Sequence, residues 1–124
     1  QITDLYRRAG WWKDPHDDPG LVSRLVSGSH CFLAAEQGGR IVGMGRAISD
    51  GASDAYIQDV TVHPDLRGRG TASRIVQALV DRLHHDGVHW IGLIAEKGST
   101  GVYGRLGFGV MAGARPMRYG ERCD

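Results

Sequence analysis

The chain has 124 residues, and its 15 Lys and Arg nearly balance its 14 Asp and Glu, which leaves a formal net charge of +1 at pH 7. This length suits one domain with one core, and the balanced charge argues against a general nucleic-acid-binding surface. No apolar run reaches membrane-spanning length, and Cys31 and Cys123 form neither a metal-ligand spacing nor a disulfide framework. We therefore expect a single domain over residues 1–124, located in the cytoplasm, without nucleic-acid, membrane or metal partners.

The first half of the chain predicts two short helices followed by three antiparallel strands. A helical mixture of apolar and charged residues ends at Gly10, and a loop with two adjacent tryptophans separates it from a second short helix. Gly38 and Gly39 join two apolar runs as a hairpin, and a turn at 50–53 leads to the third strand. The patterns place a helix at 2–8, a loop at 11–19, and strands at 31–35, 40–48 and 55–62.

A basic, glycine-rich segment then connects the third strand to an amphipathic helix. Its glycines allow the backbone to approach a ligand, and the helix that follows adds the positive end of its dipole. The pattern predicts a cradle for a diphosphate, formed by the backbone amides of residues 67–72 with Arg67 and Arg69 at its rim. A plain connecting loop with solvated arginines is the alternative.

The second half of the chain predicts a β-α-β unit around this loop. Apolar residues at 72, 75, 76, 79, 80 and 83 form one stripe of a helix that Gly87 ends. An apolar strand at 88–95 should return parallel to the strand before the loop. A short helix after residue 97 and brief strands at 108–111 and 116–119 complete the predicted mixed sheet.

Two segments resemble motifs of the GNAT superfamily of acetyl-CoA-dependent N-acetyltransferases. Residues 62–72 resemble motif A, Gln/Arg-x-x-Gly-x-Gly/Ala, with Arg67, Gly70 and Ala72 at its defined positions. Residues 102–108 resemble motif B, in which a tyrosine on a short helix precedes a Gly-Phe pair. The resemblance covers roughly residues 30–120 and implies an α+β fold whose mostly antiparallel mixed sheet has splayed central parallel strands and flanking helices. The family's first strand has no counterpart in the pattern.

The resemblance also implies acetyl-CoA as the cosubstrate. Pantetheine would add to the main chain of the third strand like a further strand, and the diphosphate would rest on the loop amides, with a serine hydroxyl as a further contact. The residues so implied are Val60, Val62, Arg67, Gly68, Arg69, Gly70, Thr71, Ala72 and Ser73.

In the implied reaction an amine attacks the thioester directly, and Tyr103 returns a proton to the departing thiolate. The base stays open, because Tyr56 and Gln58 stand where the family often has glutamate or histidine, and neither is a base at neutral pH. Asp54 and Asp59 are the nearby carboxylates. Strand alternation places Asp54 on the face of Tyr56 and Gln58 and Asp59 on the other, unless a bulge changes the register. Transfer of the proton through water is equally compatible.

The acceptor site is expected across the sheet from the cofactor. Its candidate residues are Trp11, Trp12, Tyr56, Gln58 and Glu96, with Arg46 and Asp50 as further polar contacts. Indole faces suit apolar or cationic amines, although packing is their alternative role, and Glu96 stands where many members carry asparagine.

The sequence therefore predicts an N-acetyltransferase for a small-molecule or protein amine, and a homodimer would be in keeping with the family. A CoA-binding module without turnover is the alternative. A nucleotide-phosphate-binding domain is a weaker third reading, because the loop lacks the Gly-Lys-Ser/Thr ending of a P-loop.

Overall fold

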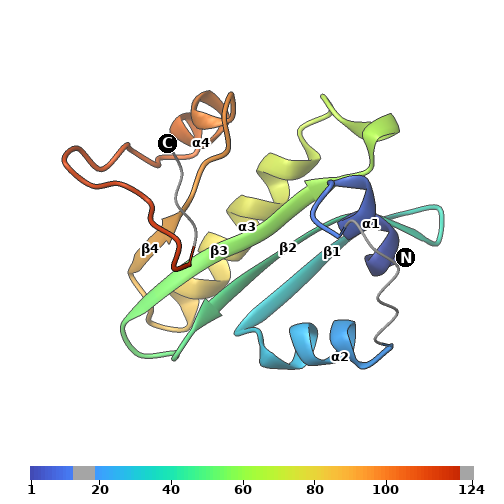
Figure 1. The fold of residues 1–124 in the computed structure, drawn as a ribbon, viewed down its shortest axis with the longest axis horizontal. Coiled ribbons are helices and arrows are strands. Elements are labelled where there is room, and N and C mark those ends of the chain that lie inside the picture. The colour runs from blue at the N-terminus through green and yellow to red at the C-terminus, as the bar shows by residue number, and fades with distance from the viewer. Residues whose placement is uncertain (13–18, 121–124) are drawn as a thin grey trace. The chain divides into compact units, whose positions relative to one another are not determined.

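The structure is a computed structural model that describes residues 1–12 and 19–120. It divides into two compact units, Gln1–Leu93 and Ile94–Asp124, each described here by itself. The first unit contains α1 (Ile2–Arg8), α2 (Pro19–Gly28), β1 (Cys31–Gln37), β2 (Arg40–Ser49), β3 (Asp54–Val62), the 3-10 turn η1 (Pro64–Leu66), α3 (Thr71–His85) and β4 (Trp90–Leu93), and the second contains α4 (Thr100–Arg105) (Figure 1). Within the described residues, no helix has the length and apolar character needed to cross a bilayer.

The predicted helices and the first four strands are confirmed, with small shifts of their ends. The part of the tryptophan loop at 13–18 lies outside the described residues. The strands predicted at 108–111 and 116–119 are wrong, since residues 106–120 contain only turns and irregular backbone. Val110 and Met117 are 86% and 95% exposed, so these runs bury little of the apolar surface that would favour a strand.

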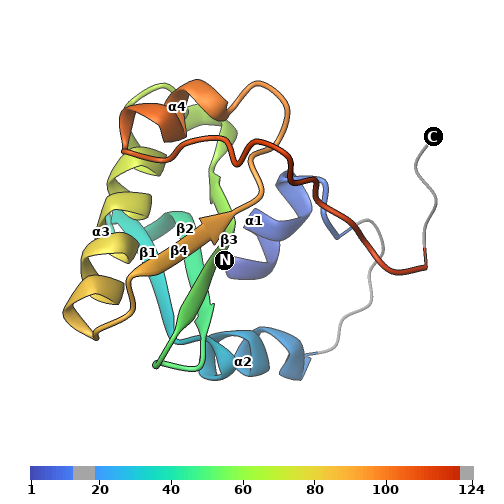
Figure 2. The same ribbon diagram turned by 90° about the vertical axis from the view of Figure 1, so that its left-hand side faces the viewer.

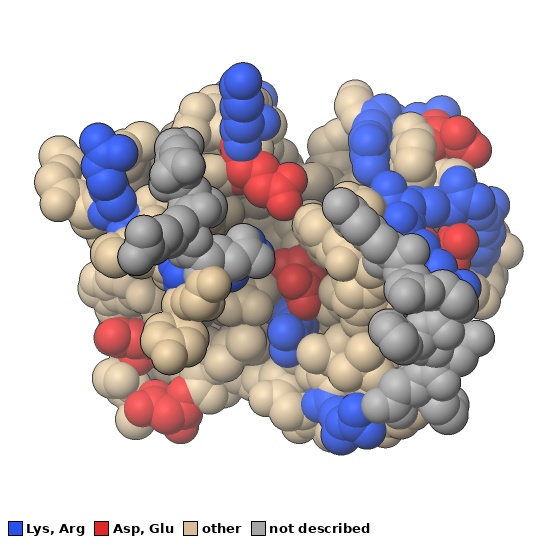
Figure 3. Space-filling model, in the orientation of Figure 1, with Lys and Arg blue, Asp and Glu red and all other residues tan. Residues whose placement is uncertain are grey.

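The four strands form one mixed sheet in the order β1-β2-β3-β4. The pairs β1–β2 and β2–β3 are antiparallel, whereas β3 and β4 are parallel, as the β-α-β pattern predicts. Figure 2 shows α3 on one face of this sheet and α1 on the other. Basic and acidic side chains are interspersed over the face seen in Figure 3.

The helix α3 packs closely on the sheet through one apolar stripe. Its residues Ile75, Val76, Leu79 and Leu83 are buried. Gly45 of β2 permits this approach, because a Cβ built there would lie only 2.8 Å from a methyl carbon of Ile75. The amides after the helix close its C-terminus, with the N–H of residue 88 donating to the carbonyl of residue 83 at 2.9 Å.

On the opposite face, α1 forms a smaller core with β2. Leu5, Tyr6 and Met44 are buried there. The Tyr6 ring stacks on Trp12, with ring centroids 4.1 Å apart and planes inclined by 6°, and it meets the edge of Trp11 at 6.0 Å. Trp12 is therefore a packing residue, and Trp11, 37% exposed, borders this core.

A β-bulge interrupts β3 at Asp59. Thr61 pairs with Met44 and Gln58 pairs with Arg46, so two residues of β3 lie opposite one of β2. Asp59 has φ +58°, the only positive value among the described non-glycine residues. The extra residue brings Asp59 onto the α1 face beside Gln58, so strict alternation, which placed Asp59 on the other face, is wrong here.

The parallel ladder ends well before the end of β3. β4 pairs with Asp54–Ile57, and its last pair joins Ile57 to Leu93. Residues 58–62 therefore have β2 on one side and no strand partner on the other among the described residues. This open stretch is compatible with the splay of the central parallel strands that the family resemblance implies.

Candidate functional site

The loop between β3 and α3 is held by local contacts at its start. His63 is buried, and its Nδ1 accepts a hydrogen bond from the Asp65 amide at 3.2 Å, which caps η1. Its Nε2 has no hydrogen-bond partner within the described part of the chain. Arg67 turns back toward the strand, and its Nε donates to the Val62 carbonyl at 3.2 Å. These contacts fix the direction in which the glycine segment leaves the sheet.

The glycine segment presents a row of unused backbone donors. Gly68 and Gly70 have φ of +80° and +77°, values that L side chains rarely adopt, and Gly70 is the N-cap of α3. Among the described residues, no acceptor pairs with the backbone N–H groups of residues 68–73. Consecutive free amides at the N-terminus of a 15-residue helix form a favourable place for an anion. The geometry fits a diphosphate, as the sequence predicts.

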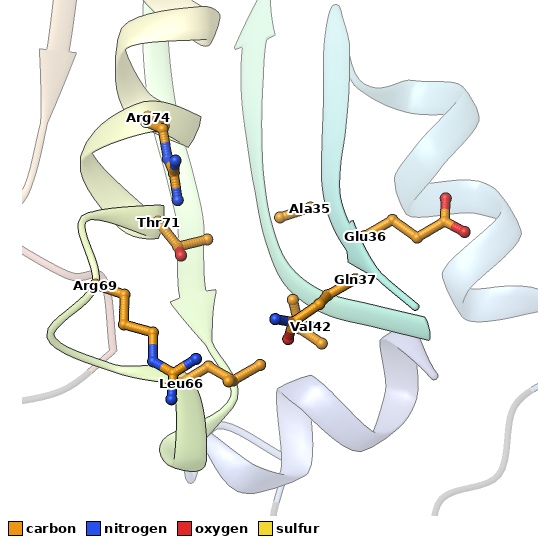
Figure 4. A pocket seen from close by; sticks show the side chains of 8 residues that line it. All are labelled: Ala35, Glu36, Gln37, Val42, Leu66, Arg69, Thr71 and Arg74. Carbon is orange, nitrogen blue, oxygen red and sulfur yellow. The ribbon is translucent and has the colours of Figure 1, made fainter. Parts of the chain in front are cut away.

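Two side chains of this segment point away from the open edge of β3. Arg69 and Thr71 line a pocket of about 200 Å³ between α3 and the β1–β2 hairpin, together with Arg74 (Figure 4). In this view Leu66 and Val42 close its floor, whereas the carboxylate of Glu36 points outward. A contact of Arg69 or Thr71 with a cofactor at the β3 edge would therefore rest on their main-chain amides.

The predicted cofactor residues of β3 also offer only their main chain. Val60 and Val62 turn their side chains toward α3, because their Cγ2 atoms lie 3.2 and 3.3 Å from the positions that a Cβ would take on Gly45 and Gly43. Their backbone belongs to the stretch of β3 without a partner on the β4 side. This arrangement agrees with the predicted addition of a pantetheine arm along the strand.

Asp59 lies in a polar cluster beneath α1. Its Oδ2 accepts hydrogen bonds from the Tyr6 hydroxyl at 2.6 Å and from the Arg46 Nε at 2.7 Å. Burial, and then the hydrogen bond to Asp59, raise the pKa of Tyr6 above its ordinary value, so the phenol stays protonated. Sequence reasoning missed Tyr6, because nothing local connects two residues 53 positions apart.

The other predicted residues of β3 are accessible. Asp54, Tyr56 and Gln58 are exposed along the same face of the sheet. Tyr56 contacts Trp90 of β4 in an edge-to-face arrangement, with ring centroids 5.7 Å apart. Trp90 is a further candidate that the sequence patterns did not single out. The pairing of Trp90 with Asp54 in the parallel ladder is the signal that could have indicated a role for Trp90.

Tyr103 and Glu96 belong to the second unit. Tyr103 starts the final turn of α4, and its carbonyl accepts from the Phe108 amide at 3.1 Å, while the two rings meet edge to face at 5.9 Å. Gly107, with φ +101°, permits this C-terminal cap, which gives the Tyr…Gly-Phe motif a structural reason. Burial, and then the Glu96 carboxylate, raise the pKa of Tyr103, so its phenol is protonated at neutral pH.

Comparison with known proteins points to the same family as the sequence motifs. The family model for the acetyltransferase (GNAT) family matches residues 1–108. The chain is 34% identical over 112 residues to the uncharacterized N-acetyltransferase ycf52 of Pyropia yezoensis, covering 87% of this chain and 63% of that protein. It is 38% identical over 111 residues to the chloroplastic serotonin N-acetyltransferase 2 of Oryza sativa subsp. japonica, covering 86% of this chain and 54% of that protein.

A solved structure gives the same answer at the level of the fold. It is an acetyltransferase assigned to the GNAT family from Xanthomonas campestris pv. campestris, 30% identical, with a TM-score of 0.71 over 90% of this chain and 79% of that chain. The chain spans less than two thirds of the two curated relatives above. The family model and these relatives show that the chain belongs to the GNAT acetyltransferase family.

Proposed function

We propose that the protein transfers an acetyl group from acetyl-CoA to a primary amine. The observation that carries this proposal is the row of open amides at residues 68–73, which lies at the end of a strand whose residues 58–62 lack a neighbouring strand on one side among the described residues. The diphosphate would take the amides, and the pantetheine arm would add to the main chain of Val60 and Val62. Acetyl-CoA would supply the activated thioester when it is bound.

The reaction needs no covalent enzyme intermediate. The amine nitrogen attacks the thioester carbonyl, the new C–N bond forms and the C–S bond breaks. A neutral amine loses one proton and the departing thiolate gains one, which balances the step; an acceptor that arrives as an ammonium group first releases one further proton to water. We assign the second transfer to the Tyr103 phenol, whose raised pKa keeps its proton available at neutral pH.

The amine proton has no dedicated acceptor in this proposal. Asp59 already accepts two hydrogen bonds on Oδ2, from Tyr6 and Arg46, and so serves first to hold the bulge. We propose that water carries the proton toward Asp59 or toward the exposed Asp54. Tyr56 and Gln58 contribute contacts to the acceptor.

An amine acceptor is supported by the names of the relatives, which specify N-acetyl transfer and, for the rice protein, serotonin. Because the chain spans about half of that protein, its substrate is a guide to the chemical class alone. The choice between a small molecule and a protein amine, a homodimeric state and a cytoplasmic location stay predictions.

A CoA-binding module without turnover is the second candidate. The observation that favours it is the absence of a free base at Tyr56 and Gln58, together with the pairing of Asp59 to Arg46. The two candidates predict the same affinity for the cofactor and differ only in thiol release.

The test combines calorimetry with an assay for free thiol. Acetyl-CoA should bind, and thiol release should require an amine. Tyr103→Phe should lower turnover at least tenfold without a change in the dissociation constant of acetyl-CoA. Tyr119→Phe, at a fully exposed tyrosine of the same unit, is the matched control. Binding without amine-dependent thiol release would select the second candidate, and no binding at millimolar concentration would reject both.

A further inference from the structure

Three large apolar side chains form an exposed row across three neighbouring strands. Ile48 of β2, Tyr56 of β3 and Trp90 of β4 are 38%, 46% and 43% exposed. Ile48 is the ladder partner of Tyr56, and the Tyr56 and Trp90 rings contact each other. We call these three residues the aromatic strip. It lies on the sheet face that α3 does not cover.

The strip is shaped to receive a flat group. The Trp90 ring bends over Gly92, since a Cβ built on Gly92 would lie 2.8 Å from two ring carbons of Trp90 and 3.5 Å from the ring of Tyr56. A side chain at position 92 would push the indole away from the strand. Glycine therefore lets the indole lie low and leaves two ring surfaces open beside each other.

The charge near the strip favours a cation. Asp54 is the ladder partner of Trp90, and no residue in the described part of the chain pairs with its carboxylate. Arg46 lies on the same face, but it is bonded to Asp59. Asp50, in the adjoining turn, accepts from the amides of residues 52 and 53. Of these three groups, the Asp54 carboxylate is thus the one without a partner in the described part of the chain.

The size of the strip argues against a subunit interface. An aromatic side chain carries roughly 150–250 Å² of surface. Because each of the three side chains is less than half exposed, the strip presents on the order of 300 Å² of apolar surface. A stable dimer needs about 800 Å² from each partner. An isolated patch of a few hundred Å² is instead the scale of a functional site for a small ligand.

The position of the strip relates it to the reaction centre of the proposed function. Tyr56 precedes the bulge residue Asp59 by three positions on the same strand, a separation of about 10 Å. Gln58 lies between them on the same face. A ring resting on the strip with an alkyl arm along β3 would carry its nitrogen toward the bulge, where the unpaired stretch of the strand begins.

We infer that the acceptor is an arylalkylamine, whose aromatic ring binds on Tyr56 and Trp90 while its amine extends past Gln58. This inference rests on the proposed acetyl transfer and assigns Trp90 and Ile48 to acceptor specificity. Asp54 lies at the ring end of this arrangement, beside Trp90, so its charge attracts the ammonium group during approach and does not hold the bound amine.

The kinetic test compares tryptamine with hexylamine, which carries the same reactive group without a ring. Tryptamine should be the better acceptor by at least tenfold in kcat/KM. Trp90→Ala should reduce kcat/KM for tryptamine about 10- to 30-fold, mainly through KM, and change that for hexylamine less than threefold. Val26→Ala, at an exposed apolar residue of α2, is the matched control.

A second measurement is independent of turnover. In protein labelled with 15N-tryptophan, the indole signal that is missing from the Trp90→Ala spectrum belongs to Trp90. This signal should shift when tryptamine is added to the wild-type protein, and the signals of Trp11 and Trp12 should not. An unmoved Trp90 signal at saturating tryptamine overturns the inference. The inference is also overturned if analytical ultracentrifugation shows a dimer of the wild-type protein and a monomer of the Trp90→Ala variant.

The outcomes separate the inference from the proposed function. Equal use of hexylamine and tryptamine, or an equal effect of Trp90→Ala on both, overturns the inference and leaves acetyl transfer standing. Absence of thiol release with every amine overturns both.

Discussion

Replacing Gly70 by aspartate or by asparagine isolates the charge that the cradle binds. Both side chains have the same shape, and both tolerate the left-handed backbone that Gly70 adopts at φ +77°. A Cβ at Gly70 meets no atom within 4 Å, so either side chain extends into open space beside the free amides. The two variants should therefore have similar stability and differ in ligand binding.

The expected difference follows from Coulomb's law. With the new carboxylate about 6 Å from each charge of a diphosphate and an effective dielectric constant of about 40–80, each repulsion costs about 0.7–1.4 kcal/mol. Two charges give about 1.5–3 kcal/mol, which is about 10- to 100-fold in the dissociation constant.

Calorimetric titration with CoA measures this difference directly, and thermal unfolding of the free variants checks that their stability is alike. At 0.5 M salt, where the screening length is about 4 Å, the difference between the variants should shrink to less than about fivefold. Equal dissociation constants for the two variants, or a difference that salt does not reduce, would refute the assignment of residues 68–73 as the diphosphate site.

Three further predictions concern the scaffold. Gly45→Ala should lower the free energy of unfolding by about 1–3 kcal/mol in urea, because its Cβ would overlap a side chain of α3. Asp59→Asn should lower it by about 2 kcal/mol, because Arg46 loses its charged partner at 2.7 Å. The hydrogen bond from His30 lowers the pKa of Asp86 below its ordinary value of 3.8. The stability that the ionised Asp86 contributes is therefore fully present above pH 3.8 and is lost as the pH falls through the folded-state pKa. The stability difference between wild type and Asp86→Asn should accordingly shrink below pH 4.

Matched changes distinguish these effects from general damage. Gly28→Ala places a Cβ where nothing lies within 4 Å and should leave stability nearly unchanged. A loss equal to that of Gly45→Ala would contradict the packing argument. A stability difference for Asp86→Asn that persists unchanged to pH 2.5 would show that the carboxylate contributes nothing through its charge. An Asp59→Asn variant as stable as wild type would show that the ion pair with Arg46 is energetically neutral.

The parts of the fold that the sequence predicts are those fixed by local rules. The helix α3 follows from its apolar stripe, and Gly87 and Gly107 mark C-terminal caps whose hydrogen bonds the structure contains. The strands predicted at 108–111 and 116–119 fail because an apolar run becomes a strand only when a partner strand completes its hydrogen bonds. Such a partner is a non-local property that composition does not encode.

The candidate site divides in the same way. The glycine segment with its open amides was predictable, since two glycines, a preceding strand and a following helix are contiguous in the chain. The acceptor side was not, because it depends on contacts between distant residues. Trp12 stacks on Tyr6, whereas Trp90, in a strand 34 positions beyond Tyr56, is the ring partner of Tyr56.

The bulge at Asp59 connects the two sides of the site. Its positive φ costs about 1 kcal/mol for a residue with a side chain, and the bonds from Tyr6 and Arg46 offset that cost. The inserted residue changes which face the following side chains occupy and coincides with the end of the β4 ladder. In the proposed function, the strand would present side chains to the acceptor before Asp59 and main chain without a neighbouring strand to the cofactor after it. One residue that breaks the regularity of the sheet would therefore separate the two proposed binding roles along a single strand.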